Sequence, residues 1–505
     1  MKNRRTLINT LSSLLLQIVT IISGFIIPRL LLKSFGSEVN GLISSLNQFL
    51  NYITLVEGGL NAVILASLYK PLSQNDENKV NSIVSAADRF YKKISLIFIV
   101  YTVILGMLYP LLVKNSFGWG YIFSLTLILS INLFSQYCFS ITWRTFLKAD
   151  KKVYVVSIVQ ITCIIINTIG VAILISIYPN VHIVKLFSAL IYLLQPLIFN
   201  LYIKKKYKIN KKVEPDKQAL AQRWDGLGIN IAAFIHNNTD VVILTLLADL
   251  KSVSIYSVYY LVTTGLKNLI TSISGGIVPT LGHAYAEGNS EKLNKIFDRY
   301  ELIIYIATFL LFVLGGILIT PFVMIYTKGI YDANYYQPIL GWIMILAEFA
   351  FCIREPYVNM AYVANKFKEV SKYAYIEAGI NIVLSTILVI RFGIIGVAIA
   401  TFIAMIYRTL AHMIYLQKNI LYRDIRKALK KLLIFIISAG AIIILSKSVF
   451  CMKEVSILSW IIYAIKNTIL ALVVYGITIL IFYRKQIGQI INKRGKINET
   501  NQIMQ

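Results

Sequence analysis

Residues 25–36 read FIIPRLLLKSFG and place a helix-breaking proline beside a permanent cation. The apolar run that ends here begins at Leu7, and Pro28 and Arg29 interrupt it before the chain becomes polar. A charged side chain at bilayer depth costs about 2.5–3.5 kcal/mol on insertion scales, so it normally faces a partner, a wet cavity or the membrane interface. The stretch therefore predicts a membrane-spanning helix with an arginine of special role near one end.

The composition of the whole chain is that of a polytopic membrane protein. Of its 505 residues, 57% are hydrophobic and 14% are charged, and the mean hydropathy is +0.70. A soluble domain is less apolar and carries about a quarter charged residues. A membrane helix needs about 20 mainly apolar residues, and fourteen such runs occur: 7–32, 41–68, 94–113, 121–143, 153–178, 181–203, 226–248, 254–282, 301–326, 337–364, 373–390, 394–416, 429–446 and 457–482. The predicted fold is all-α, with about 14 transmembrane helices.

The basic residues that give the chain its net charge of +27 are distributed as a membrane topology predicts. With the amino terminus assigned to the cytoplasm, the tails and loops on that side hold 37 of the 50 Lys and Arg residues, and the opposite loops hold 8. This asymmetry obeys the positive-inside rule and predicts a cell (cytoplasmic) membrane protein with both termini cytoplasmic. We therefore expect no nucleic-acid partner, and we expect the basic stretch 204–223 to rest on anionic membrane lipids.

Neither the amino terminus nor the cysteines indicate another class of protein. Leu7–Leu32 follows a basic start as a signal peptide would, but it is too long and lacks a small-x-small cleavage site. The cysteines lie far apart without C-x-x-C spacing, at Cys138, Cys163, Cys352 and Cys451. We expect a retained first helix, buried thiols, no metal site and no cofactor.

The two halves of the chain share short motifs in the same order. The matching pairs are GGLNAVI (58–64) with GGIVPTL (275–281), KVNSI (79–83) with KLNKI (292–296), and YPLLV (109–113) with TPFVM (320–324). Each half holds six predicted helices, an even number, so the two copies cross the membrane in the same direction. Transporters built from such parallel repeats bind their substrate between the halves.

The repeat predicts four parts of the chain. They are an N-lobe of helices 1–6 at 1–203, a basic cytoplasmic linker at 204–225, a C-lobe of helices 7–12 at 226–416, and helices 13–14 with a cytoplasmic tail at 417–505. The last two helices lie outside the repeat.

Three stretches also carry a family pattern. They are IIPRLLLKSFGSEVNGL at 26–42, the GG ends of helices two and eight, and RFGIIGVAIAT at 391–401. With them the chain resembles, from its first helix to its fourteenth, the polysaccharide flippases (Wzx type) of the multidrug/oligosaccharidyl-lipid/polysaccharide exporter superfamily. The resemblance implies two six-helix lobes around a central cavity, two extra C-terminal helices, and the movement of lipid-linked sugars across the cytoplasmic membrane.

Five basic residues lie inside predicted helices: Arg29, Lys267, Arg354, Arg408 and Lys466. Lys267 stands at the middle of its span, and Arg354 and Arg408 lie about four residues, or ~6 Å, from the middle of theirs. Lys466 belongs to a peripheral helix. We expect Lys267, Arg354 and Arg408 to bind a diphosphate in the cavity, because a partly dehydrated cation attracts phosphate far more strongly than one in water.

Arg29 has two interpretations. It lies near the outer end of its helix, where an arginine that snorkels to the interface is an adequate explanation. Pro28 removes a backbone donor and is expected to kink the helix, which would turn Arg29 toward the cavity. The family resemblance favours the cavity, so Arg29 joins the predicted diphosphate-binding residues.

Titratable side chains at membrane depth are the candidates for ion coupling. Glu57 lies in helix two, and Asp240 and His236 lie in the HNNTD cluster of helix seven. A histidine titrates near neutral pH; hydrogen bonds between helices are the alternative role for this cluster. Glu348 and Glu355 in helix ten are candidates for interhelical ion pairs that fix packing.

The sequence predicts a transporter without enzyme activity. It has no nucleotide-binding motif, metal-ligand spacing or nucleophile elbow, and its longest polar stretch, about 20 residues, is too short for a soluble domain. We expect a flippase that moves an undecaprenyl-diphosphate-linked oligosaccharide repeat unit to the outer leaflet by alternating access, for surface polysaccharide synthesis. Its expected partners are this lipid-linked substrate, membrane lipids and a polysaccharide polymerase. The alternatives are a peptidoglycan-precursor flippase, a multidrug or metabolite exporter of the same superfamily, and an intramembrane transferase or polymerase.

The predicted topology can be tested with single cysteines in a background without native cysteines. Asn210→Cys and Ile487→Cys should resist an impermeant thiol reagent added to intact cells, because both positions are predicted to be cytoplasmic. Both should react after the cells are opened. Efficient labelling of either position from outside would refute the topology.

Overall fold

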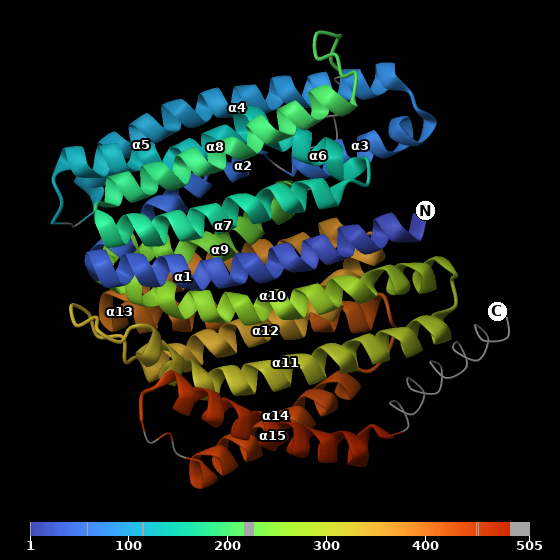
Figure 1. Ribbon diagram of the computed structural model, residues 1–505. Coiled ribbons are helices and arrows are strands. Elements are labelled where there is room, and N and C mark those ends of the chain that lie inside the picture. Colours follow the sequence, from blue (N-terminus) through green and yellow to red (C-terminus); the bar gives the residue numbers. More distant parts are fainter. Residues whose placement is uncertain are drawn as a thin grey trace. The chain divides into compact units, whose positions relative to one another are not determined.

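The computed structural model describes residues 2–57, 59–113, 116–216, 227–450, 452 and 454–484, and these form a multi-pass, all-helical membrane protein (Figure 1). No strand occurs within these ranges. The helices are α1 (Lys2–Asn51), α2 (Thr54–Glu57), α3 (Leu60–Gln74), α4 (Glu77–Leu112), α5 (Trp119–Ser135), the π-helical turn η1 (Gln136–Ser140), α6 (Ile141–Ala149), α7 (Val153–Ile177), α8 (Val181–Lys206), α9 (Leu227–Leu247), α10 (Leu250–Ala286), α11 (Ser290–Tyr326), α12 (Pro338–Val363), α13 (Phe367–Asn419), α14 (Arg426–Val449) and α15 (Ile457–Phe482).

The described helices account for the predicted spans. Nine of them are long and apolar enough to cross a membrane. Two of the nine, α1 and α13, are interrupted by a non-helical glycine, Gly36 and Gly393, so each holds two predicted spans. Helices α9, α10 and α12 account for the three others. The predicted fold class, an all-α membrane protein with about 14 helices, is therefore confirmed.

The described residues form two compact units. Unit 1 contains those up to Leu261 together with Gly329–Asn334 and Leu384–Val397, and unit 2 contains the remainder. Helices α10 and α13 each contribute residues to both units. The lobe boundaries expected near residues 203, 225 and 416 stay a prediction.

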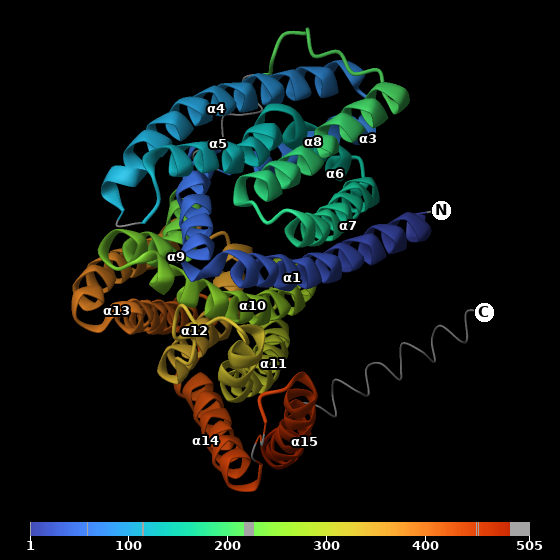
Figure 2. The same ribbon diagram turned by 60° about the vertical axis from the view of Figure 1, so that its left-hand side comes forward.

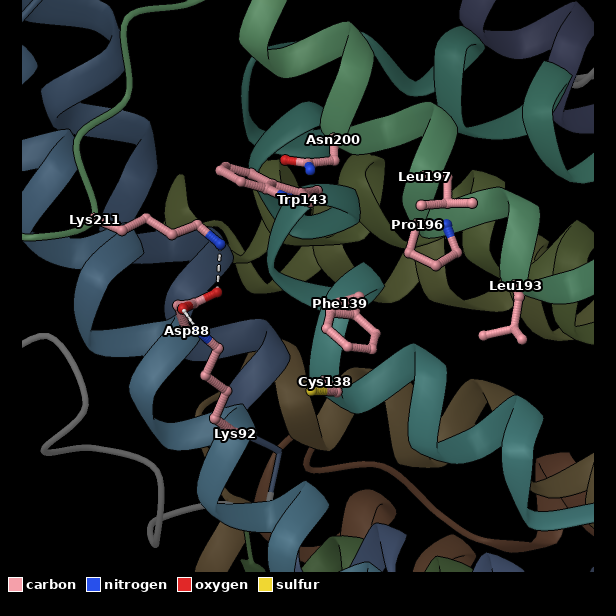
Figure 3. A pocket seen from close by; sticks show the side chains of 10 residues that line it. All are labelled: Asp88, Lys92, Cys138, Phe139, Trp143, Leu193, Pro196, Leu197, Asn200 and Lys211. Carbon is pink, nitrogen blue, oxygen red and sulfur yellow. Dashed lines mark hydrogen bonds and ion pairs between the residues drawn. The ribbon is translucent and has the colours of Figure 1, made fainter.

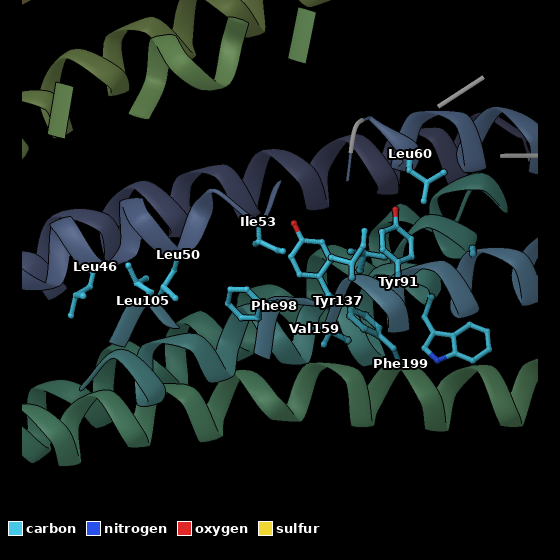
Figure 4. Packing of buried hydrophobic residues seen from close by; sticks show 14 of the residues in the cluster. Leu46, Leu50, Ile53, Leu60, Tyr91, Phe98, Leu105, Tyr137, Val159 and Phe199 are labelled. Carbon is cyan, nitrogen blue, oxygen red and sulfur yellow. The ribbon is translucent and has the colours of Figure 1, made fainter. Parts of the chain in front are cut away.

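The core of unit 1 is one buried cluster that joins the second segment of α1 to helices α3–α8 (Figure 4). Leu46 and Leu50 of α1 join Phe98 and Leu105 of α4 in one buried cluster. The opposite face of α4 is apolar but exposed, as shown by Leu96, which is 65% exposed. In a membrane protein such a face is covered by lipid, since lipid tails are as apolar as the side chains they touch.

The stretch 25–36 ends in a sharp turn of α1 at Gly36 (Figure 2). Gly36 has φ +82°, a conformation that glycine adopts without steric cost. The helix resumes at Ser37, whose backbone N–H and Oγ donate to the two carboxylate oxygens of Asp332, each at 2.7 Å. A carboxylate at a helix start satisfies a free N–H and complements the helix dipole. The turn therefore lies at Gly36, whereas the backbone stays helical through Pro28.

One ion pair recurs at the same place in both halves of the chain. Asp88 of α4 pairs with Lys211, and Asp298 of α11 pairs with Arg423 at 2.6 Å. The two acids are 210 residues apart and the two cations 212 residues apart. Each cation lies in the segment that follows the sixth predicted helix of its half, and each stands over an aromatic ring.

The repeated K-x-N-x-I motif has the same local role in both halves. The helix that contains it starts with a side-chain cap, from Asp76 in α4 and from Asn289 in α11. The motif asparagine then contacts the segment after the sixth helix: Asn81 accepts from the backbone N–H of Asn210, and Asn294 donates to the carbonyl of Leu421. An internal duplication predicts this correspondence.

The turn at Gly36 generates a stability prediction. Gly36→Ala places a Cβ 2.9 Å from the Asp332 carboxylate in a left-handed conformation, and it should cost about 1–3 kcal/mol. Asp332→Ala removes the helix cap and should cost about 0.5–2 kcal/mol. Both should lower the unfolding temperature of the purified protein. Gly24→Ala, which meets nothing within 4 Å, is the control and should not lower it.

Candidate functional site

Lys267 and Glu348 form a buried ion pair at membrane depth in unit 2. Lys267 Nζ of α10 lies 2.9 Å from Glu348 Oε1 of α12, and each residue is 6% exposed. The ammonium also stands 5.1 Å from the centre of the Phe351 ring. Removing two charges from water is expensive, and it is tolerated when the partners are close and hydrogen-bonded. The pair therefore ties α10 to α12.

A second buried cluster joins two arginines to one acid. Arg408 pairs directly with Glu377, and Arg354 Nη1 lies 3.9 Å from the same carboxylate. Glu377 and Arg408 come from the segments of α13 on either side of Gly393. Glu377 is 1% exposed and Arg354 is 3% exposed, so both arginines share one carboxylate away from water.

Spacing on α12 connects the two clusters. Glu348, Phe351 and Arg354 follow one another at intervals of three residues, which places them on neighbouring parts of one helix face. Arg354 stands 4.6 Å from the centre of the Phe351 ring, the same ring that Lys267 approaches. The structure thus brings Lys267 and Arg354 to one aromatic side chain.

Three buried polar atoms of this site lack a hydrogen-bond partner among the described residues. Within the described part of the chain, Glu348 Oε2, Arg354 Nε and Arg408 Nε are buried and make no hydrogen bond. A buried polar group without a partner costs about 1–3 kcal/mol. The three cations lie close to three acids: Glu348, Glu377 and Glu355, which follows Arg354 on α12 and interacts with it electrostatically. A bound anion would satisfy the two guanidinium donors, Arg354 Nε and Arg408 Nε.

A polar network lies beside the cations. Glu355 Oε2 accepts hydrogen bonds from Ser274 and Asn359, both at 3.1 Å, and Asn359 also donates to Tyr300 at 2.9 Å. These residues come from α10, α11 and α12. The network supplies amide and hydroxyl groups of the kind that recognise a polar ligand.

The predicted site residues do not all lie together. Lys267, Arg354 and Arg408 belong to unit 2, whereas Arg29 is a half-buried residue of α1 in unit 1. Their orientation toward a shared cavity stays a prediction.

The candidates for ion coupling occupy hydrogen-bonded positions in unit 1. Glu57 accepts from the hydroxyls of Tyr91 at 3.4 Å and Tyr137 at 3.3 Å, and Asp240 accepts from Tyr256 at 2.5 Å. His236 lies outside the residues whose side chains the structure describes. The roles of Glu57, Asp240 and His236 in coupling stay predictions.

Two acids with central positions were not among the predicted residues. Glu377 holds both arginines, and Glu301 is fully buried against Lys431 at 2.5 Å. Both lie inside predicted spans, 373–390 and 301–326, so the rule that intramembrane charges have partners or functions would have found them.

Comparison with solved structures identifies the fold. No protein-family model matches this chain, and no curated protein matches it in sequence. The lipid II flippase MurJ, in an inward closed conformation, superposes with a TM-score of 0.74 at 17% identity, over 95% of this chain and 100% of the other. This chain has the fold of that flippase.

Multidrug transporters give further matches to the fold. The eukaryotic MATE transporter AtDTX14 superposes with a TM-score of 0.60 at 11% identity, covering 85% of this chain and 99% of the other. An inward-facing multidrug resistance MATE family transporter of the MOP superfamily gives 0.57 at 14%, covering 82% and 96%. At such identities the similarity establishes the fold alone.

The ion pair between Lys267 and Glu348 can be tested by single and double substitution. Lys267→Met strands a buried carboxylate, so it should destabilise the protein by about 3–5 kcal/mol and lower its yield as a monodisperse peak in size-exclusion chromatography. Lys267→Met with Glu348→Leu should restore most of that yield. Lys466→Met, at an exposed lysine of α15, is the control. An equal loss in the single and double variants would contradict the pairing.

Proposed function

We propose that this protein is a flippase that moves an undecaprenyl-diphosphate-linked oligosaccharide repeat unit from the cytoplasmic to the outer leaflet of the cell membrane, without enzyme activity of its own. The lipid tail stays in the bilayer and the headgroup passes through the protein by alternating access. The observation that carries this proposal is the group of three buried cations, two of which share one carboxylate, on helices of a flippase-like fold.

The chemistry of the cations supports a diphosphate ligand. Arg354 and Arg408 share Glu377, and each retains an unsatisfied guanidinium nitrogen within the described residues. Guanidinium groups bind phosphate oxygens in a fixed, forked geometry, and such charge-assisted bonds are stronger where water is excluded. A diphosphate would satisfy these donors, and Lys267 could exchange its bond to Glu348 for a bond to the ligand.

The comparisons support a flippase over a multidrug exporter. The match to the lipid II flippase extends over 95% of this chain, whereas the matches to the MATE transporters cover 82–85%. A pocket for cationic drugs would favour a surplus of acids, and this cluster holds three cations and three acids. Translocation of a peptidoglycan precursor is the second candidate, because it too carries a diphosphate.

Function can be measured in liposomes with a fluorescently labelled undecaprenyl-diphosphate oligosaccharide and an impermeant quencher. The reconstituted protein should make the inner-leaflet label accessible much faster than protein-free liposomes do. Lys267→Met with Glu348→Leu should fold but transport at least about tenfold more slowly, the equivalent of losing about 1.4 kcal/mol of ligand interaction. Lys466→Met should transport normally. Normal transport by the double variant would exclude a role for Lys267 in binding.

Cargo and driving force need separate controls. Labelled lipid II competing as well as the oligosaccharide lipid would favour the peptidoglycan-precursor alternative, and transport of ethidium would favour a multidrug exporter.

The free energy of one charge changes by about 2.3 kcal/mol when it crosses a membrane potential of 100 mV, so a dianion gains about twice that amount. A potassium diffusion potential should therefore accelerate transport in one direction and slow it in the other. Dependence on a proton gradient alone would instead favour coupling through Glu57 or Asp240.

A further inference from the structure

Unit 1 contains a cavity of about 360 Å³ between α4, the turn η1 with α6, and α8 (Figure 3). It is lined by Asp88, Lys92, Cys138, Phe139, Trp143, Leu193, Pro196, Leu197, Asn200 and Lys211. A second hollow of about 690 Å³ continues it along the segment 203–212 and shares Trp143, Asn200 and Lys211. None of these residues belongs to the candidate transport site.

One end of the cavity is basic. Lys92 and Lys211 approach Asp88 from two sides, Lys92 at 2.9 Å, so two ammonium groups share one carboxylate (Figure 3). The side chains of Lys92 and Lys211 are 55% and 31% exposed, and both remain accessible to a ligand. Burial lowers the pKa of Lys211, and the Asp88 carboxylate opposes this shift. Further lysines line the adjoining hollow: Lys204, Lys208 and Lys212.

The other end of the cavity is apolar and accessible. Phe139 of η1 is 51% exposed and Leu197 of α8 is 58% exposed. Helix α8 carries no charged residue between Leu186 and Phe199 and ends in three consecutive lysines at 204–206. The cavity therefore extends from the apolar part of α8 toward its basic end, where a positive protein surface meets the headgroups of anionic lipids.

The second half of the chain covers the corresponding face with protein. Leu302 of α11, 210 residues after Lys92, is fully buried in a cluster with Phe435 of α14 and Tyr475 of α15. Lys431 of α14 reaches Asp298, the counterpart of Asp88, at 3.0 Å. Helices α14 and α15 follow the repeat, so the first half carries no copy of them, and its Lys92 and Leu96 stay exposed.

We propose that an anionic phospholipid of the cytoplasmic leaflet occupies this cavity, with its phosphate against Lys92 and Lys211 and an acyl chain along Phe139 and Leu197. The lipid takes the place on α4 that α14 takes on α11. Its phosphate balances the positive charge that Asp88 leaves uncompensated on the two lysines. Its acyl chain covers the apolar side chains. The site is independent of the transported cargo. An anionic headgroup is preferred because the two lysines exceed Asp88 by one charge.

Native mass spectrometry of the full-length protein can test this site, with phosphatidylglycerol and phosphatidylcholine as probes. The protein should retain phosphatidylglycerol in preference to phosphatidylcholine. Lys92→Gln with Lys211→Gln should weaken phosphatidylglycerol binding about 25-fold, since each lysine near a membrane surface contributes about a factor of five. The matched control is Lys427→Gln with Lys430→Gln, at two exposed lysines, and it should bind like the unaltered protein.

The apolar half of the site has its own test. Leu197→Phe narrows the groove on its apolar side, and it should weaken phosphatidylglycerol binding while leaving the chromatographic profile unchanged. Quenching of Trp143 fluorescence by phosphatidylglycerol with brominated chains, assigned by its loss in Trp143→Phe, should fall in the same variant. The proposal is overturned if the two-lysine variant binds phosphatidylglycerol normally, if phosphatidylcholine binds equally well, or if glycerol phosphate alone displaces the lipid.

Discussion

A charge that leaves water for the bilayer interior needs a partner, and this constraint organises unit 2. The pair of Lys267 with Glu348 joins α10 to α12, and Glu377 holds Arg408 and Arg354 across α12 and α13. Breaking one such pair costs more than the pair contributes, because the remaining charge stays buried. The helices are thus held together by groups that a ligand phosphate can also bind. A transporter can use this arrangement, since exchange of an internal partner for a ligand makes binding and helix movement interdependent.

The repeated ion pair lies at corresponding positions of the two halves, as an internal duplication predicts. Asp88 with Lys211 and Asp298 with Arg423 both fasten the end of the sixth helix to the third. In the second half, Lys431 of α14 joins the same acid. In the first half, Lys92 takes the corresponding place and stays accessible. The same electrostatic feature therefore anchors protein in one half and favours lipid in the other.

Much of the fold was predictable from the sequence. Each long apolar run became a helical segment, because the free energy of transferring about 20 residues into hydrocarbon depends on those residues alone. The cations Lys267, Arg354 and Arg408 were also predictable, because a charged residue within an apolar run can be recognised in the sequence without knowing its partner. The π-helical turn η1, which brings Cys138 and Phe139 to the lipid cavity, left no comparable signal.

The sequence by itself determined that the chain spans the membrane many times and that several charges lie within its apolar runs. Only the tertiary structure decided how those charges are paired. Glu377 became the partner of two arginines, and Asp332 capped a helix that starts 295 residues earlier at Ser37. The reason is physical: hydropathy is a property of a single segment, whereas an ion pair or a cap depends on which segments become neighbours, and that is settled only when the helices pack.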